Sequence, residues 1–160
     1  MARTGESCAV LVMDFDRMKR VNDSLGHAAG DELLQRVGTI LRKRTRASDA
    51  AARVGGDEFA ILLTNTEAQQ AGALAKDILA AIAGCRVPTD NGAAWTTVSI
   101  GIATLTSDDP LGLTAMSRAD DAMYSAKRRG GDCMTVAPGE PPALLGAAPT
   151  PRWRETADGG

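Results

Sequence analysis

Two short clusters of carboxylates are the residues of this chain that are best suited to chemistry. Asp57 and Glu58 follow the glycine pair Gly55-Gly56 and precede a strand-like apolar run, residues 59–63. Adjacent acids at a tight turn contribute little to folding, because like charges repel and are costly to desolvate. Taken alone, the run is most simply interpreted as a solvated acidic turn. The functional interpretation is a divalent cation that holds a phosphate substrate.

The second acidic cluster, Asp14-Phe15-Asp16, ends the apolar segment 8–13. A buried strand that ends in carboxylates holds hard oxygen ligands at a sheet edge, which suits Mg²⁺. If this strand lies beside the glycine hairpin, Asp14 and Asp57 converge on one metal site, as two-metal phosphoryl transfer requires. The pattern does not fit a calcium loop, because Met18 falls at the position of an oxygen ligand, and the chain contains no P-loop or dinucleotide-binding glycine motif.

Composition limits the class of protein. The chain has 160 residues, 44% hydrophobic and 24% charged, as expected for one globular domain of ordinary size. A net charge of −2 and 3% aromatic residues argue against non-specific binding to nucleic acid or to an anionic membrane. No apolar run is long enough to span a bilayer and no secretory signal opens the chain. Three widely spaced cysteines without a C-x-x-C pair indicate reduced thiols in a cytoplasmic protein.

Hydrophobic periodicity predicts the element order β-α-α-β-β-α-β-α-β. Gly55-Gly56 is predicted to form a two-residue turn with positive φ at both glycines, and Asn91-Gly92 marks a further hairpin. This order predicts an α+β domain with a mainly antiparallel sheet over residues 1–136, followed by a disordered Pro/Ala/Gly-rich tail, 137–160. The expected strands are 8–13, 50–54, 59–63, 95–103 and 133–136; the expected helices are 17–25, one from Asp31 to about Arg44, one capped by Thr66 with Gln69 and stopped by Gly84, and 114–129.

Five motifs, in order along the chain, resemble those of one family, the GGDEF domains or diguanylate cyclases. The resemblance covers about Val10 to Val136, and five short motifs in register are far more specific than any one of them. It implies a palm-like (ferredoxin-like) nucleotidyl-cyclase fold with a five-stranded sheet flanked by helices. The motifs are Asp14-Phe15-Asp16-Arg17-Met18-Lys19-Arg20-Val21-Asn22-Asp23, Gly26-His27-Ala28-Ala29-Gly30-Asp31, Gly55-Gly56-Asp57-Glu58-Phe59, Val98-Ser99-Ile100-Gly101, and residues 119–127.

The resemblance implies an enzyme that joins two GTP molecules into cyclic di-GMP and releases pyrophosphate. It would use Mg²⁺ or Mn²⁺ and act as a homodimer, because the two bound substrates must face each other. The roles implied are metal binding by Asp14, Asp57 and the Phe15 carbonyl; metal binding or deprotonation of the 3′-hydroxyl by Glu58; phosphate stabilisation by Lys19 and Lys127; guanine binding by Asn22 and Asp31; and a position near the substrate for His27.

Several of these residues also have a purely structural interpretation. His27 follows a glycine before a helix, where capping or solvation is the commoner role. Lys19 and Lys127 fit solvated helix faces, as most lysines do, and Asn22 fits a polar residue at a helix end. The acids of the predicted metal site are the residues that a structural role explains least well.

Arg46-Ala47-Ser48-Asp49, just before the glycine hairpin, resembles the R-x-x-D inhibitory site of the same family. The fork of Arg46 would bind a phosphate or guanine of cyclic di-GMP, with Asp49 beside it. The pattern is common by chance, and its register with the hairpin makes it informative. The resemblance therefore predicts feedback inhibition by the product.

The chain departs from the family pattern at three places. The family's usual N-terminal helix and its D-x-L-T-G-L-x-N-R segment are not found in the seven residues before Cys8, so the fold is expected to lack that helix. Gly131 replaces a phosphate-binding arginine, and Asp77 replaces an arginine that often completes the inhibitory site. These departures leave a second hypothesis, a catalytically impaired module that binds GTP or cyclic di-GMP and regulates a partner. A palm domain acting on nucleic acid is a remote third, given the charge and the scarce aromatics.

Overall fold

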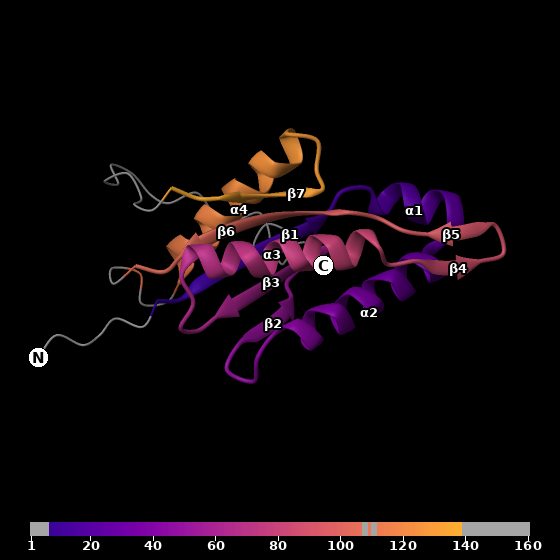
Figure 1. Ribbon diagram of the computed structural model, residues 1–160. Coiled ribbons are helices and arrows are strands. Elements are labelled where there is room, and N and C mark those ends of the chain that lie inside the picture. The colour runs from indigo at the N-terminus through magenta and orange to yellow at the C-terminus, as the bar shows by residue number, and fades with distance from the viewer. Residues whose placement is uncertain (1–6, 107–108, 110–111, 139–160) are drawn as a thin grey trace, which may run out of the picture.

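The structure is a computed structural model that describes residues 7–106, 109 and 112–138 (Figure 1). The strands are β1 (Ala9–Phe15), β2 (Ala50–Arg53), β3 (Glu58–Leu63), β4 (Val87–Thr89), β5 (Gly92–Ala94), β6 (Val98–Thr104) and β7 (Cys133–Val136); the helices are α1 (Met18–Leu25), α2 (His27–Arg44), α3 (Ala68–Ala83) and α4 (Leu113–Arg128).

The main sheet has the strand order β2-β3-β1-β6-β7, with β1 at its centre. The pairings β2–β3, β3–β1 and β1–β6 are antiparallel, and β6–β7 is parallel. The strands β4 and β5 form a separate hairpin that extends from the body of the domain (Figure 1). The predicted α+β class with a mainly antiparallel five-stranded sheet is therefore confirmed.

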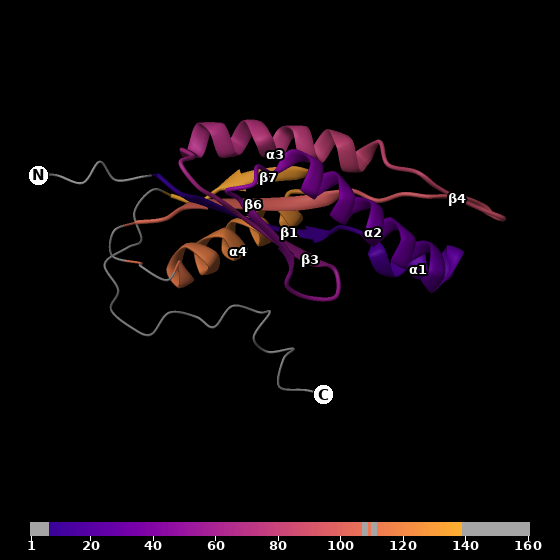
Figure 2. The same ribbon diagram turned by 90° about the horizontal axis from the view of Figure 1, so that it is seen from below.

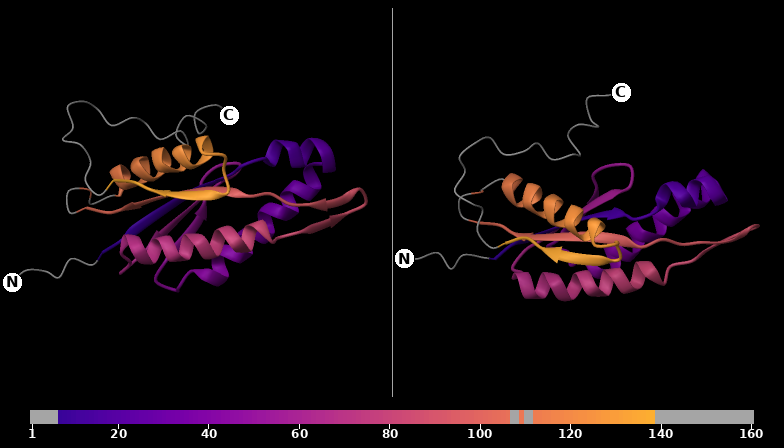
Figure 3. Two further views of the ribbon diagram at one scale, coloured as in Figure 1. Left: turned by 45° about the horizontal axis from the view of Figure 1, so that its top comes forward. Right: turned by 90° about the horizontal axis from the view of Figure 1, so that it is seen from above.

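Helices cover both faces of this sheet, and for that reason β1 is apolar on both sides. Leu11 and Met13 belong to a core that they share with α2 and α3, whereas Val10 and Val12 belong to a second core under α4. Figures 2 and 3 show α3 and α4 on opposite sides of the sheet. Burial on both faces explains why this strand reads as a continuous apolar run and not as an alternating one.

The second helix begins four residues earlier than predicted, at His27 and not at Asp31. Gly26 ends α1 and directly precedes α2, with a φ of 89° that L-residues rarely adopt. Since one glycine suffices to turn the chain between the two helices, no loop separates them. The first turns of α2 are therefore helical where the sequence pattern suggested a connection.

The N-terminus of α3 lies one residue later than the predicted cap. The side chain of Glu67 accepts a bond from the backbone of Gln70, and the Gln70 side chain accepts one from the Glu67 N–H, so Glu67 and not Thr66 forms the capping box. The Thr66 hydroxyl instead donates to the Thr64 carbonyl, at 2.8 Å. Thr66 therefore stabilises the turn that leads into the helix.

Two further boundaries differ from the prediction. The strand expected over 95–103 is β6, which starts at Val98 and leaves Trp95 half exposed between the β4–β5 hairpin and the sheet. Ala137, assigned by the sequence to the tail, is buried and donates its N–H to the Ile102 carbonyl. Residues 139–160, the rest of the predicted tail, lie outside the described residues.

Helix α4 packs directly against the backbone of β6 at Gly101. A Cβ atom at this position would lie 1.8 Å from the Ala119 carbonyl oxygen and 2.3 Å from the Met123 nitrogen, both backbone atoms of α4. Neither atom can move away without moving the helix. Gly101 therefore sets the distance between α4 and the sheet.

We predict that Gly101→Ala lowers the free energy of unfolding by about 3 kcal/mol or more, because the added methyl group forces α4 away from the sheet. The matched control is Gly72→Ala in α3, where the new Cβ would meet the flexible Met134 methyl at 3.4 Å. Urea unfolding of both variants measures the effect. Equal stability of the two variants would contradict the close approach at Gly101.

Candidate active site

The end of β1 lies against the glycine hairpin, as the sequence predicted. Asp14 is paired with Glu58 across β1 and β3, and the Phe15 N–H donates to the Asp57 carbonyl at 3.3 Å. Residues directly opposite each other in an antiparallel pair project to the same face of the sheet. The two acidic clusters therefore meet at one edge of the fold.

The glycine hairpin is wider than predicted. Residues 54–57 separate β2 from β3, and positive φ does not occur at Gly55 or Gly56, so the two-residue turn expected here is wrong. The Arg53 guanidinium instead closes the loop by donating to the Gly55 carbonyl at 3.2 Å and to the Gly56 carbonyl at 2.7 and 3.0 Å. The Val54 and Gly55 N–H groups also donate to the Glu58 carbonyl, at 2.9 and 3.4 Å, so backbone and side-chain bonds together hold the loop.

Glycine at position 55 leaves room for the Glu58 side chain. A Cβ atom there would lie 3.0 Å from Glu58 Oε2, so the carboxylate folds back over the loop. Asp57 is exposed at the tip and Glu58 is half-buried. The hairpin therefore presents two acids with different environments, one open to solvent and one packed against the loop.

Lys127, in the last turn of α4, reaches across the sheet to the end of β1. Its Nζ atom lies 3.0 Å from Asp14 Oδ2 and donates a hydrogen bond to the Phe15 carbonyl at 2.8 Å. Both side chains of the ion pair are largely buried, with 27% of Lys127 and 23% of Asp14 exposed. An ammonium group therefore lies on two of the oxygens that the sequence assigned to a metal.

Burial raises the pKa of Asp14 above its ordinary value of 3.8, and the nearby charge of Asp57 acts in the same direction. The hydrogen bond and positive charge of Lys127 oppose this rise. Because burial without a cation penalises the charged carboxylate, this position favours a positively charged partner.

Asp16 connects three segments of the fold, a role that the sequence did not predict. Its carboxylate accepts hydrogen bonds from the hydroxyls of Thr97 and Ser99 and from the Asp132 N–H. These bonds join the end of β1 to the start of β6 and to the α4–β7 turn. Residues i and i+2 of a strand face the same side, so the spacing of Asp14 and Asp16 gave no sign that their roles differ.

Gly131 in the α4–β7 turn has no room for a side chain. Its φ is 77°, and a Cβ atom would lie between 2.6 and 2.8 Å from three atoms of the Asp16 carboxyl group. An arginine at this position would therefore displace Asp16. Arg129, two residues earlier, donates to the Thr135 hydroxyl at 3.4 Å and so points toward β7.

Asn22 in α1 carries a buried acceptor without a donor. Its Oδ1 atom has no hydrogen-bond partner among the described residues. Gly30 of α2 makes room for it, because a Cβ atom there would lie 1.9 Å from this oxygen. A buried acceptor left unpaired is costly, and this one fits a site that a ligand's N–H groups would complete.

Three further predicted ligand contacts are exposed. Lys19 lies on α1, His27 at the start of α2, and Asp31 one residue after the glycine that contacts Asn22. None of them has a hydrogen-bond or ion-pair partner within the part of the chain that the structure describes. Asp31 thus follows directly after the residue that contacts Asn22.

In the predicted inhibitory motif, Asp49 has structural bonds of its own. One carboxylate oxygen accepts the Arg46 N–H at 2.9 Å and the other accepts the Thr64 N–H at 3.2 Å. The Arg46 side chain is exposed. The turn therefore fixes the backbone of the motif and presents its arginine to solvent.

Asp77 is neutralised by an ion pair. Arg44 Nε at the end of α2 lies 2.7 Å from Asp77 Oδ2 on α3. The pairing with Arg44 therefore reduces the repulsion between Asp77 and a nearby phosphate. Because Asp77 is 60% exposed, the pair itself adds little to stability.

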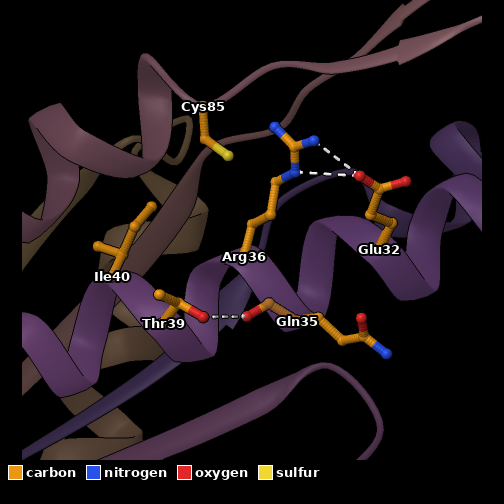
Figure 4. A pocket seen from close by; sticks show the side chains of 6 residues that line it. All are labelled: Glu32, Gln35, Arg36, Thr39, Ile40 and Cys85. Atoms are coloured by element: carbon orange, nitrogen blue, oxygen red, sulfur yellow. Dashed lines mark hydrogen bonds and ion pairs between the residues drawn. The ribbon is translucent and has the colours of Figure 1, made fainter.

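Two open cavities lie away from the acids. One, of about 510 Å³, runs along α2 and reaches Cys85; within it Arg36 pairs with Glu32 at 2.7 Å, so its charges compensate each other (Figure 4). The other, of about 580 Å³, lies between α1 and the segment that joins β5 to β6, with Arg20 and Trp95 among its lining residues. Neither is lined by Asp14, Asp57 or Glu58, so neither contains the predicted metal ligands.

The oxygen atoms at the end of β1 suit a divalent cation whose remaining coordination positions are filled by a bound ligand. Among the described residues, no three His, Cys, Asp or Glu side chains gather closely enough to hold a metal by themselves. The Asp14 carboxylate and Phe15 carbonyl nevertheless already accept a cation, the Lys127 ammonium. Hard oxygens of this kind suit Mg²⁺, which keeps several positions for water and phosphate.

The sheet order and the acids at the end of its central strand define a palm-like nucleotidyl-cyclase domain. Residues 1–133 match the family model described as "Diguanylate cyclase, GGDEF domain". The chain belongs to the GGDEF family. In the residues described, no helix has the length and apolar character needed to cross a membrane.

Characterised relatives and solved structures agree with this assignment. The chain is 37% identical over 131 residues to diguanylate cyclase A of Treponema denticola and 39% identical over 135 residues to diguanylate cyclase DgcP of Pseudomonas aeruginosa. These alignments cover 82% and 84% of the chain but 35% and 20% of the relatives, so the chain spans about a third or less of their length.

Among solved structures, the chain is similar to the GGDEF domain of TpbB (YfiN) from Pseudomonas aeruginosa, with a TM-score of 0.76, 37% identity and 84% of each chain covered. It is also similar to the GGDEF domain of DgcB from Caulobacter crescentus in complex with c-di-GMP, with a TM-score of 0.78, 29% identity and coverage of 82% of this chain and 78% of that one.

We predict that Gly30→Ala weakens binding of a GTP analogue about tenfold, the equivalent of one lost hydrogen bond, because the new methyl group displaces the Asn22 amide. The clash is with the end of a side chain and not with backbone, so rotation of Asn22 allows the fold to be retained. Isothermal titration calorimetry measures the affinity.

The matched control is Gly38→Ala in the same helix, where a Cβ atom meets nothing within 4 Å. It should fold and bind the nucleotide as the parent chain does. Equal nucleotide affinity in both variants would contradict a ligand role for Asn22.

Proposed function

We propose that this chain is the catalytic domain of a diguanylate cyclase, which converts two GTP molecules into cyclic di-GMP and two pyrophosphates. The observation that carries the proposal is the cation position at the end of β1. There the Asp14 carboxylate and the Phe15 carbonyl hold the Lys127 ammonium beside the hairpin of Asp57 and Glu58. In a member of this family, that arrangement supports Mg²⁺-dependent nucleotidyl transfer.

Asp14, the Phe15 carbonyl and Asp57 would hold the metal, Mg²⁺ or Mn²⁺. The metal would polarise the phosphoryl oxygens and offset the charge that develops during transfer. Asp57 is exposed and its backbone is fixed by the bond to Phe15, so its carboxylate can complete the set without rearrangement of the sheet.

The remaining residues would act on the substrate directly. Glu58 would accept the proton of the attacking 3′-hydroxyl, whose oxygen bonds to the α-phosphorus of the other GTP as pyrophosphate leaves. Lys19 and Lys127 would stabilise the phosphates, since fixed cations are most effective where negative charge develops. Two such transfers close the cyclic product.

Guanine would bind between α1 and α2. Asn22 and Asp31 offer oxygen acceptors to the N1–H and N2–H₂ donors of the base, and the unpaired Oδ1 of Asn22 supports this assignment. His27, at the start of α2, would lie near the substrate. A cytoplasmic homodimer would bring two bound GTP molecules face to face.

The experiment incubates the purified chain with GTP and Mg²⁺ and quantifies cyclic di-GMP by chromatography. We predict product from the parent chain and at least a hundredfold less from Asp57→Ala, because several kcal/mol of metal-derived charge stabilisation are lost. Asp90→Ala, which removes an exposed acid from the β4–β5 turn, should keep the parent rate. Equal product from the Asp57 and Asp90 variants would overturn the assignment.

We also propose that cyclic di-GMP inhibits the enzyme at Arg46 and Asp49. The exposed guanidinium on a backbone fixed by Asp49, and the pairing of Asp77 with Arg44, support a site that accepts phosphate. Arg46→Ala should raise the concentration of product needed for half-inhibition about tenfold or more, because a charge-assisted bidentate contact is lost. Initial rates with added cyclic di-GMP measure this, with Arg42→Ala as the control. An unchanged inhibition curve for Arg46→Ala would reject the site.

One observation favours a second candidate, a GTP-binding or cyclic di-GMP-binding module without turnover. Gly131 occupies the position of a phosphate-binding arginine of the family, and the structure has no room for a side chain there. If the parent chain binds the GTP analogue with Mg²⁺ but forms no cyclic di-GMP, this second function replaces the first.

A further inference from the structure

The ammonium of Lys127 lies where a metal ligand set is expected. It is 3.0 Å from Asp14 Oδ2 and 2.8 Å from the Phe15 carbonyl oxygen, so one cation bridges both oxygens. The side chains of Lys127 and Asp14 are both largely buried, and the two residues are far apart in the sequence. The ion pair is therefore a largely buried tertiary contact between α4 and β1, and not an exposed surface salt bridge.

A divalent ion and this ammonium compete for the same two oxygens. Mg²⁺ binds oxygen at about 2.1 Å, which is closer than the ammonium lies, and two cations on one carboxylate repel each other in a partly buried site. Metal binding at Asp14 and Phe15 is therefore expected to displace Lys127.

The structure allows the Lys127 side chain to move while its helix stays in place. Gly101 fixes the distance between α4 and β6, and the Asp16 carboxylate binds the Asp132 N–H in the turn that follows the helix. The lysine has a flexible four-carbon stem, and 27% of the side chain is exposed. Departure of the ammonium thus needs only a change of side-chain rotamer.

We propose that Lys127 is an internal counter-ion that occupies the cation position of the metal-free chain and exchanges with the metal when nucleotide binds. The inference rests on the proposed function, since it assigns the same site to a metal with GTP. Before binding, Lys127 neutralises Asp14. After binding, the metal neutralises Asp14, and the released ammonium pairs with the phosphates.

This exchange couples metal binding to nucleotide binding. Without nucleotide, a metal must displace Lys127 from two oxygens and leave the ammonium without an anionic partner. With nucleotide, the phosphates receive the ammonium, so the displacement is compensated. Coupling of this kind is reciprocal, so the metal raises nucleotide affinity by the same factor. The chain would therefore have a low metal affinity until its nucleotide substrate is bound.

The test measures Mn²⁺ affinity at pH 8 by the electron paramagnetic resonance signal of free Mn²⁺, with and without a non-hydrolysable GTP analogue. The proteins are the parent chain, Lys127→Met, Lys127→Gln and Arg128→Met. Arg128 is exposed and adjacent in α4, so its variant removes the same charge without touching Asp14. Urea unfolding confirms that each protein is folded, and the glutamine variant serves if the methionine variant is not.

Without nucleotide, the Lys127 variants should bind Mn²⁺ about tenfold more tightly than Arg128→Met and the parent chain. The gain in Mn²⁺ affinity that the analogue produces should be correspondingly smaller in the Lys127 variants. Equal or weaker Mn²⁺ binding by the Lys127 variants, with normal binding in the presence of the analogue, would overturn the exchange and leave the proposed function intact. Absence of saturable Mn²⁺ binding in every protein, with the analogue present, would overturn the metal site and the exchange together.

Discussion

A charged carboxylate at the end of a buried central strand is stable only beside a cation, and the rest of the domain is arranged around that pairing. Asp14 projects from β1, the strand that is buried on both faces, and its burial raises its pKa. In the structure, the ammonium of Lys127 is that cation. The sheet order, the position of α4 and the register between β1 and β3 all serve to bring a cation and further acids to this one oxygen pair.

The parts of the fold that look remote from the acids act on them through backbone positions. Gly101 sets the distance of α4 from the sheet, and so the reach of Lys127. Asp16 ties the strand end to β6 and to the α4–β7 turn, where Gly131 is shaped around its carboxylate. Site and scaffold are therefore one network of contacts. The replacement of an arginine by Gly131 is part of that network and not an isolated loss.

The sequence predicted those features that local pattern determines. The apolar run of β1, the amphipathic face of α2 and the meeting of Asp14 with the glycine hairpin were all confirmed. Because the order of motifs identifies the family, the class of fold was also predictable. Element boundaries were less accurate, since Gly26 joins two helices without a loop and Glu67 competes with Thr66 for the same cap.

Contacts between segments far apart in sequence were not predictable from pattern. The pairing of Lys127 with Asp14, the bonds of Asp16 to β6 and the fit of Asn22 over Gly30 depend on how the elements pack. The four-residue hairpin loop was missed because the Arg53 side chain and backbone bonds to the Glu58 carbonyl close it without positive φ at either glycine. Each of these contacts joins residues through tertiary packing, which no local propensity encodes.

The most direct test of this account is a crystal structure of the chain with Mn²⁺ and a non-hydrolysable GTP analogue, with anomalous scattering used to locate the metal. The account predicts an anomalous peak bound by the Asp14 carboxylate and the Phe15 carbonyl, with Asp57 beside it and the Lys127 ammonium moved onto the phosphates. A bound nucleotide whose metal lies away from Asp14, or a Lys127 that still bridges Asp14 and Phe15, would contradict it.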